Sequence, residues 1–424
     1  MMAHPLAQGA STADPARLLV VYNANWTGDE DGDGVQDSLE VAQYYMAKRG
    51  IPAANILGVA TNDSGYDAST YAAMHSELIT PLKNKLAALG TTNIDIILMS
   101  YRMPIGFRGQ SIDNLVMGLN YWSTTSDNIS WTTNPYLEPT PTIGSDNGGF
   151  LHSSYQFNGT TMYLVCRLDG SFGVTGCLDL VDQALYGDRY VSSQAGYYGG
   201  NIYVDSDGRG GTSDATLAAN PAVQSGNYSS YSDCDANIGY GEHYVAASGF
   251  PLKWTCGDGT IGAAGLTFQD GSDATSAPRA LMYGGWYNYN NYKNVFEWLP
   301  GSVACDLNSS SLIDYWLRLP TTLAWGRRAL CSGATCVCGV TGEPYTTGHT
   351  RPNVLLYYML NGYSFAEAAA AANPAIGWMS YAIGDPLYAP TRAKTLVRDT
   401  QNPGFAAGSP TLVMNERNGC AVKI

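Results

Sequence analysis

The sequence has little charge and few basic residues, and this excludes one large class of partners. Charged residues make up 14% of its 424 residues, and 22 Lys and Arg stand against 36 Asp and Glu, for a net charge of −14. A chain this acidic has no electrostatic attraction for nucleic acid or for an anionic membrane surface. We therefore expect no nucleic-acid partner.

Long apolar runs are also absent. No stretch reaches the roughly 18 consecutive apolar residues that a membrane-spanning helix needs, so no transmembrane segment is predicted. The N-terminal segment has neither the basic start nor the apolar core of a signal peptide. If the protein is secreted, as the features below predict, we expect its signal peptide to be absent from this sequence.

Zinc knuckles of the C-x-x-C type are missing, although the chain has nine cysteines. Cys331, Cys336 and Cys338 crowd one segment, and no His follows them at ligand spacing. Dispersed cysteines favour disulfides in an oxidising, extracellular compartment. We expect most of them to be paired, with at least one bridge among these three, and the odd cysteine to stay free or to pair between chains.

A regular series of acidic residues follows the first predicted strand, which is the apolar, β-forming run at 18–22. Oxygen-bearing side chains occupy positions 1, 3, 5, 9 and 12 of a twelve-residue segment: Asp29, Asp31, Asp33, Asp37 and Glu40. Gly34 stands at position 6, and the backbone carbonyl of Val35, at position 7, would add a further oxygen. This is the spacing of a calcium-binding loop.

Calcium is therefore the predicted cofactor, and a solvated acidic turn is the alternative. The physical reason for the spacing is that a hard cation takes about seven oxygens, while Gly permits the sharp turn that brings them together. A strand rather than a helix precedes the loop, and a helix that ends at Gly50 follows it. We interpret the segment as a calcium loop inserted after the first strand of an α/β unit, with a structural rather than a signalling role.

Predicted strands and helices alternate along the chain, which is typical of an α/β fold with a largely parallel sheet flanked by helices. The further strands are expected at 94–100, 162–168, 202–205, 280–284, 301–306 and 336–340, and the main helices at 71–89, 178–185, 242–247, 321–330, 354–360 and 365–372. We expect one domain over 17–392 with irregular insertions near 122–160 and 206–235, a disordered or peripheral segment at 1–16, and a peripheral tail at 393–424.

Several short motifs occur together as a set, and they carry a family resemblance. They are Arg167-Leu168-Asp169-Gly170, Tyr283-Gly284-Gly285-Trp286-Tyr287, Gly362-Tyr363-Ser364-Phe365-Ala366-Glu367-Ala368 and Gly384-Asp385-Pro386-Leu387-Tyr388. Over residues 17–392 the chain resembles an uncharacterised bacterial secreted family that occurs in genomes with the exosortase protein-sorting system. The resemblance implies secretion but no particular activity, and the calcium loop is an insertion relative to the family pattern.

A more distant resemblance is to gingipain-type cysteine peptidases, whose catalytic domains also end near a Gly-Asp-Pro like that at Gly384. It implies a caspase-like fold with a His at one strand end and a Cys at the next. Here Trp286 stands where the His is expected, and Cys336 or Cys338 has only His349 nearby in sequence. Because an indole cannot accept a proton, we expect a cysteine-peptidase mechanism to be absent.

Carboxylates at strand ends offer another chemistry. Asp169, Glu343 and Asp385 follow predicted strands, and ligands bind at the carboxyl edge of a parallel sheet. Two such acids beside aromatic rings would form a sugar cleft with a general acid and a second carboxylate. The expected substrate-binding rings are Trp286, Tyr287, Tyr289 and Trp298. The alternative is that these acids cap helices and hold loops through arginines.

The sequence thus predicts a secreted calcium-binding α/β protein that is a candidate hydrolase of extracellular polysaccharide or protein, with Asp169, Glu343, Asp385 and His349 as candidate catalytic residues. Two alternatives stay open. One is a non-catalytic protein that binds carbohydrate or a cell-surface ligand. The other is a structural subunit of an extracellular matrix or filament, for which the odd cysteine and the low charge would support self-association.

Overall fold

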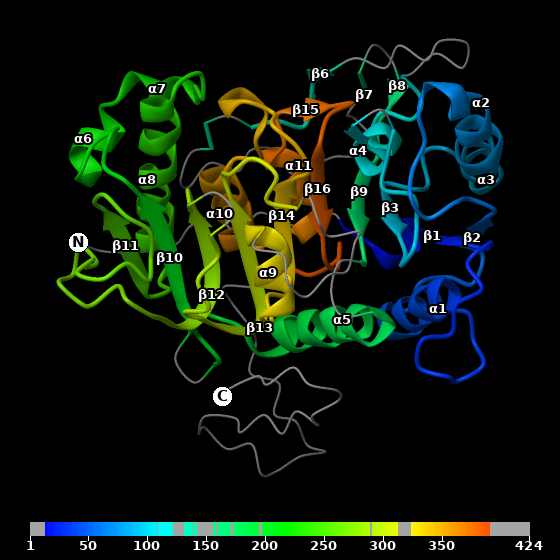
Figure 1. The fold of residues 1–424 in the computed structure, drawn as a ribbon, viewed down its shortest axis with the longest axis horizontal. Coiled ribbons are helices and arrows are strands. Elements are labelled where there is room, and N and C mark those ends of the chain that lie inside the picture. Colours follow the sequence, from blue (N-terminus) through cyan, green and yellow to red (C-terminus); the bar gives the residue numbers. More distant parts are fainter. Residues whose placement is uncertain are drawn as a thin grey trace.

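The computed structural model describes residues 13–107, 109–121, 131–138, 140–141, 156–157, 160–169, 173–194, 197–288, 291–312 and 324–390. Within them the chain has an α/β fold, as predicted, with a large and mostly parallel central sheet flanked by helices (Figure 1). The predicted tail at 393–424, and most of the predicted insertion at 122–160, lie outside the described residues.

The central sheet has ten strands. Their bounds are β1 (Leu18–Asn23), β2 (Ile56–Val59), β3 (Ile96–Met99), β9 (Leu164–Arg167), β10 (Asn201–Ser206), β11 (Leu252–Cys256), β12 (Ala277–Gly285), β13 (Phe296–Asp306), β14 (Cys336–Val340) and β16 (Ser380–Ile383). Their order across the sheet is β11-β10-β12-β13-β14-β16-β9-β3-β1-β2. Every predicted strand is confirmed, whereas β2, β11 and β16 are not predicted by the sequence pattern.

The sheet consists of two parallel halves that run in opposite directions. One half contains β11, β10, β12, β13 and β14, and the other contains β16, β9, β3, β1 and β2. At the seam β14 and β16 are antiparallel, with Val337 opposite Ile383 and Val340 opposite Ser380. The carboxyl ends of the two halves therefore lie at opposite edges of the sheet.

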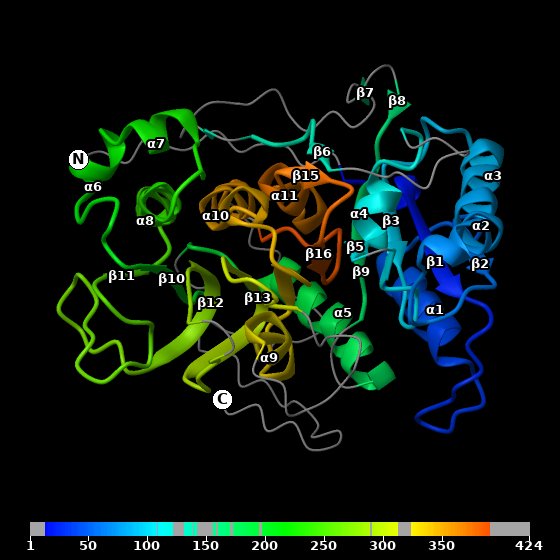
Figure 2. The same cartoon turned by 45° about the horizontal axis from the view of Figure 1, so that its top comes forward.

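Helices cover both faces of this sheet (Figure 2). One side holds α1 (Asp37–Arg49), α5 (Gly173–Tyr190) and α9 (Trp325–Cys331). The other side holds α2 (Tyr71–Met74), α3 (Thr80–Leu89), α4 (Ile112–Met117), α8 (Tyr231–Ser248), α10 (Pro352–Leu360) and α11 (Phe365–Ala372). Two short helices, α6 (Asp214–Ala218) and α7 (Pro221–Ser225), pack against α8.

Strand β1 shows how the sequence produces this layering. Leu18 and Val20 belong to the large core that also contains Tyr45 of α1, whereas Leu19 and Val21 belong to a second core with residues of α3. Successive side chains of a strand point to opposite faces of the sheet. A continuous apolar run is therefore needed here, because both faces of β1 are covered by helices.

The segment at 206–235 differs from the sequence expectation, because it is largely helical rather than irregular. Ser213 caps α6 in a capping box with Thr216, Asn220 caps α7 just before Pro221, and Ser230 caps α8. Such local side-chain caps satisfy the free amides of a helix start. The helix predicted at 242–247 is therefore only the last part of α8.

The remaining regular structure consists of short pieces. The predicted helix at 71–89 is confirmed, although a π-helical turn (His75–Ile79) separates α2 from α3. Three two-stranded pairs are β4 (Gly106–Phe107) with β5 (Gln110–Ser111), β6 (Thr132–Thr133) with β15 (Ala375–Ile376), and β7 (Gln156–Phe157) with β8 (Thr160–Thr161). Among the described residues, no helix combines the length and the apolar character needed to cross a membrane.

The disulfide prediction is wrong for the described part of the chain. None of its cysteines is in a disulfide: Cys166, Cys177, Cys234, Cys256, Cys305, Cys331, Cys336 and Cys338. All but Cys331 are buried, and those of β13 and β14 take the places of small apolar residues in the core. Spaced cysteines therefore reflect packing here, since free Cys behaves as a small apolar residue. Cys420 lies outside the described residues.

Candidate functional site

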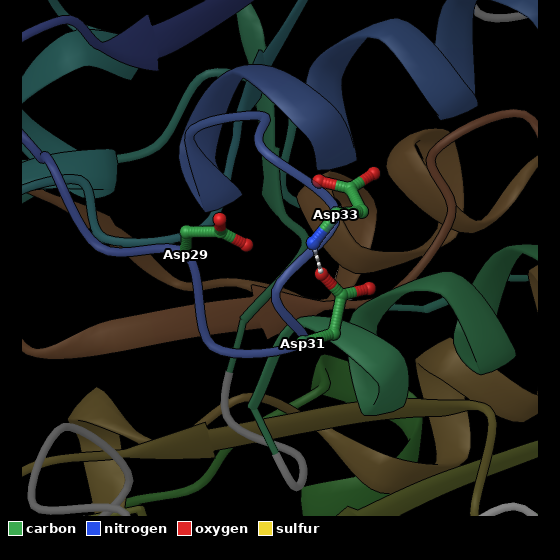
Figure 3. A group of neighbouring side chains, drawn as sticks. All are labelled: Asp29, Asp31 and Asp33. Carbon is green, nitrogen blue, oxygen red and sulfur yellow. Dashed lines mark hydrogen bonds between the residues drawn. The ribbon is translucent and has the colours of Figure 1, made fainter.

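The acidic loop between β1 and α1 brings three carboxylates together. Carboxylate oxygens of Asp29, Asp31 and Asp33 lie within 4.8 Å of one another, and all three residues are exposed (Figure 3). Asp29 accepts hydrogen bonds from the backbone amides of Gly32 (2.8 Å) and Gly34 (3.0 Å). The loop thus curls around its first carboxylate, which places the oxygens of alternate residues on one side.

Glycine at position 6 makes this turn possible. Gly34 has a φ of +87°, a backbone conformation in which a side chain is strained. The next residue, Val35, donates its amide to Oδ1 of Asp33 at 2.7 Å. Asp33 in turn donates its own amide to Oδ1 of Asp31 at 3.3 Å, the dashed contact in Figure 3. The two hydrogen bonds fix the side chains at positions 3 and 5 of the loop.

Glu40, in the first turn of α1, lies near this cluster. Its Oε2 atom is buried and has no hydrogen-bond partner among the described residues. The pKa of Glu40 is raised to about 7, first by burial and then by the negative charges of Asp31, Asp33, Asp37 and Asp29. A buried, unpartnered carboxylate oxygen beside like charges is costly unless a cation is close.

Asp37 has a different place from the other predicted ligands. It is fully buried and accepts hydrogen bonds from the indole N–H of Trp26 (2.7 Å) and from the amide of Glu30 (2.8 Å). These bonds join the beginning of the loop to the first residue of α1. Asp37 therefore positions the loop, while Asp29, Asp31 and Asp33 bring their carboxylates together and Glu40 lies close enough to feel their charge.

An arginine supports the loop from the side of the sheet. Arg102 pairs with Glu30 at 2.8 Å and lies over the Trp26 ring at 4.0 Å from its centroid. Asn23, at the end of β1, donates to the carbonyl of Arg102 at 2.8 Å. The backbone of Arg102 has a φ of 64°, which is uncommon for a residue other than glycine. These contacts hold the loop against the residues that follow β3.

The strand-end carboxylates do not all lie at one edge of the sheet, because Asp169 and Asp385 follow parallel neighbours and Glu343 lies at the opposite edge. Asp169 and Asp385 follow β9 and β16, whereas Glu343 follows β14, which runs in the opposite direction. The expectation of one common carboxyl edge is wrong because the sheet reverses at the seam between β14 and β16. Asp169 is also buried, with only 1% of its surface exposed.

Asp385 lies in a buried polar network. It accepts hydrogen bonds from the Tyr45 hydroxyl (3.0 Å), from Nε of Arg49 (2.6 Å) and from the Leu387 amide (2.9 Å). Its side chain has no exposed surface. Arg49 also pairs with Asp188 at 2.5 Å, so one guanidinium joins α1, α5 and the end of β16. This is the loop-holding arrangement that the sequence leaves open as an alternative.

The thiols of Cys336 and Cys338 and the imidazole of His349 are all buried. Burial raises the pKa of the Cys336 and Cys338 thiols and lowers the pKa of His349 to about 4. These shifts keep both groups neutral, whereas a thiolate nucleophile needs an environment that favours its charge. Glu343 is exposed and accepts hydrogen bonds from the Ser309 hydroxyl and from the Tyr345 amide (3.0 Å).

The predicted substrate-binding aromatics separate into two groups. Tyr287 and Trp298 are 2% and 5% exposed, and both pack around Trp325 in the core. Trp286 is partly exposed at the carboxyl end of β12, where its ring lies 5.1 Å from that of Tyr231, edge to face. Tyr289 lies outside the described residues.

Two buried acids, Asp205 and Asp306, are not among the predicted catalytic residues. Asp205 of β10 pairs in register with Gly285 of β12, and Gly285 pairs with Asp306 of β13. The two acids therefore lie in one row across the three strands. Tyr283 donates to Asp205 at 3.2 Å, and the Tyr287 amide donates to Asp306 at 2.9 Å. Burial raises the pKa of Asp205 to about 8 and that of Asp306 to about 7. An Asp at the end of an apolar β-forming run is the signal that would reveal them.

Comparisons of the chain with protein-family models, with curated proteins and with solved structures found no match. The resemblances to the exosortase-associated family and to the gingipain-type peptidases therefore stay predictions. The geometry of the described side chains is what supports a functional proposal.

Proposed function

We propose that this protein binds one calcium ion in the loop at 29–40 and that the ion stabilises the junction between β1 and α1. The observation that carries the proposal is the cluster of Asp29, Asp31 and Asp33 carboxylates beside Glu40, whose buried Oε2 atom has no hydrogen-bond partner among the described residues. A hard divalent cation takes carboxylate and carbonyl oxygens, and it would relieve the repulsion among these acids.

The residues that would hold the ion are Asp29, Asp31, Asp33 and Glu40, with the carbonyl of Val35. Asp37 keeps the loop closed through Trp26 and Glu30. When bound, calcium would place a positive charge beside the Glu40 carboxylate, which otherwise has only negative neighbours in the loop. Glu40 belongs to the first turn of α1, so calcium binding would stabilise the start of this helix. The same helix contains Tyr45 and Arg49, which donate hydrogen bonds to Asp385.

Calorimetric titration of the purified chain with CaCl2 tests this proposal. We expect one site, with a Kd of about 10⁻⁴ to 10⁻³ M if the protein works outside the cell. Asp31→Asn and Glu40→Gln should each weaken binding severely, and Asp63→Asn, outside the loop but near Arg102, serves as the control. An absence of saturable calcium binding by the unchanged chain would refute the proposal.

Two further parts of the proposal concern the location of the protein and the type of its fold. An extracellular location is proposed with the calcium loop, since calcium sites of extracellular modules bind the ion weakly and a Kd in that range would agree with it. A caspase-like arrangement is supported by the run of parallel strands covered by helices on both faces and by Gly384-Asp385-Pro386 after the last described strand. Expression from the native gene in its own host, followed by fractionation of cells and medium, would test the location.

Carbohydrate binding without catalysis is a second candidate function, favoured by one surface cluster. Tyr231 is 61% exposed and meets Trp286 edge to face, and the Arg209 guanidinium lies 5.9 Å from the centroid of each ring. Asp207 pairs with Arg209 at 2.7 Å. Exposed rings beside hydrogen-bonding groups suit the mixed apolar and polar faces of sugars.

A screen of neutral and acidic oligosaccharides by affinity electrophoresis tests this second function. Retardation that Tyr231→Ala and Trp286→Ala both remove, and that Tyr345→Ala leaves intact, would support it. Tyr345 is a suitable control because it is 73% exposed and follows a different strand, β14. Retardation unchanged in the two ring variants would refute a role for this cluster.

A further inference from the structure

A pocket of about 300 Å³ lies at the amino-terminal ends of β10, β11 and β12. Its lining includes Ser193, Gln194, Tyr197, Asn201, Phe250 and Arg279. This volume is at the lower limit of typical small-molecule sites. The pocket is at the opposite edge of the sheet from Trp286 and Tyr231, and it is independent of the calcium loop.

Arg279 gives the pocket its charge. None of the pocket-lining residues is acidic. Among the described residues, no carboxylate lies within ion-pair distance of Arg279, although the chain has a net charge of −14. Seven other basic residues are paired with carboxylates, namely Arg17, Lys48, Arg49, Arg102, Arg167, Arg209 and Lys253. Arg279 is thus an exposed cation that no described carboxylate compensates.

The backbone holds Arg279 in an unusual conformation. Its φ is 51°, and it lies where the register of β12 shifts against β13, between Ala277 and Ala280. A β-bulge re-aims a side chain, and strained residues cluster at binding sites. The guanidinium donates to the carbonyl of Gly199 and lies 5.7 Å from the centroid of the Tyr198 ring. These contacts orient the side chain. A guanidinium has five N–H donors, so further donors remain to bind a ligand.

The chemistry of the lining identifies the class of ligand. A single guanidinium matches one carboxylate, which it can bind through two parallel hydrogen bonds. The hydroxyl of Ser193 and the side-chain carbonyl of Asn201, whose amide nitrogen donates to the carbonyl of Pro278 at 2.8 Å, are uncharged partners for sugar hydroxyls. The half-buried Tyr197 and the buried Phe250 supply apolar surface for the face of a ring. We propose that this pocket binds a monosaccharide unit that carries a carboxylate, such as a uronic acid.

Titration calorimetry of the full chain with glucuronate and with a galacturonate trisaccharide tests the proposal. Glucose and a galactose trisaccharide are the neutral counterparts, and inorganic phosphate is the competing anion. We expect saturable binding of the acidic sugars, with binding of the neutral sugars and of phosphate at least about tenfold weaker. No binding of the acidic sugars, or equal binding of their neutral counterparts or of phosphate, would overturn the proposal.

Variants separate binding from folding. Arg279→Ala should weaken acidic-sugar binding by about tenfold or more, and Arg279→Lys by less, because Lys keeps the charge but not the fork of donors. Arg279→Gly accepts a positive φ without strain, so it should fold at least as well as the unchanged chain and still lose binding. Lys48→Ala removes the same charge elsewhere and should bind normally. Unchanged binding in Arg279→Gly would disprove the assignment.

Discussion

The Tyr45 hydroxyl donates a 3.0 Å hydrogen bond to Oδ1 of Asp385, although the two residues are 340 positions apart in the chain. Tyr45 belongs to the helix α1, which follows the acidic loop at 29–40, and Asp385 follows the seam strand β16. The same carboxylate pairs with Arg49. This contact joins the first helix to the end of the described chain, and it makes Asp385 a structural residue.

Removal of this carboxylate should therefore destabilise the protein strongly. Asp385→Ala leaves the Arg49 guanidinium, only 10% exposed, with fewer partners, and loss of one member of a buried ion pair costs about 3–5 kcal/mol. The control Lys48→Ala breaks a surface pair with Asp182 and should cost less than about 1 kcal/mol. Urea unfolding followed by circular dichroism measures both. Equal effects of the two substitutions would contradict this account.

Calcium should raise the melting temperature of the protein. Because the ion binds the folded loop and not the unfolded chain, calcium at a hundredfold excess over Kd should add about 2.7 kcal/mol to the free energy of unfolding. Differential scanning fluorimetry in CaCl2 and in EGTA measures the shift. Glu40→Gln should melt at nearly the same temperature in both buffers. A shift of equal size in that variant would mean that calcium acts at another place.

Stability should fall as the pH rises toward 8, because of the buried acids. The pKa of Asp205 is raised to about 8 in the folded protein, above its ordinary value of 3.8. Between these values the folded state holds a proton that the unfolded state has lost, so this group lowers stability by about 1.4 kcal/mol per pH unit. Above pH 8 the loss is complete.

The substitution Asp205→Asn tests this slope, because the amide resembles the protonated acid. We expect little change in the free energy of unfolding near pH 4 and a clear gain relative to the unchanged chain near pH 8. Asp182→Asn, at a half-exposed surface position, is the matched control. Parallel pH profiles of the unchanged chain and Asp205→Asn would exclude a titrating Asp205.

The cysteines should react as thiols once the protein is unfolded. A thiol reagent added in denaturant without reductant should find at least eight reactive groups, since none of the eight described cysteines is in a disulfide. In the native protein the reaction should be slow, because burial keeps the core thiols of β13 and β14 neutral. A count of one or two thiols would show that the cysteines pair after all.

Sequence patterns predict the fold class well because long apolar runs leave few alternatives. The run at 18–22 must be covered on both faces, and the alternating helices supply that cover. The pattern misses β2 and β11, the two outermost strands, which are partly exposed. It also misses β16, whose four residues carry too little periodicity to distinguish a strand from a loop.

The acidic loop could be predicted from the sequence, whereas the carboxylate cleft could not, because only the first depends on residues that are close in the chain. The convergence of Asp29, Asp31 and Asp33 follows from local spacing, which the sequence contains in full. The proposed cleft of Asp169, Glu343 and Asp385 depends on the relative direction of distant strands, which no local pattern reports. Because β14 and β16 are antiparallel, Glu343 lies at the other edge.

The position of β16 also determines how the chain can fold during synthesis. β16 is the strand that joins β14 of one half-sheet to β9 of the other, and it is the last strand of the described chain. While a ribosome is still translating the residues before Ser380, both halves expose an unpaired edge, which is the feature that promotes aggregation of nascent chains. Completion of the sheet is therefore a late event, and it depends on a segment of four residues, Ser380–Ile383.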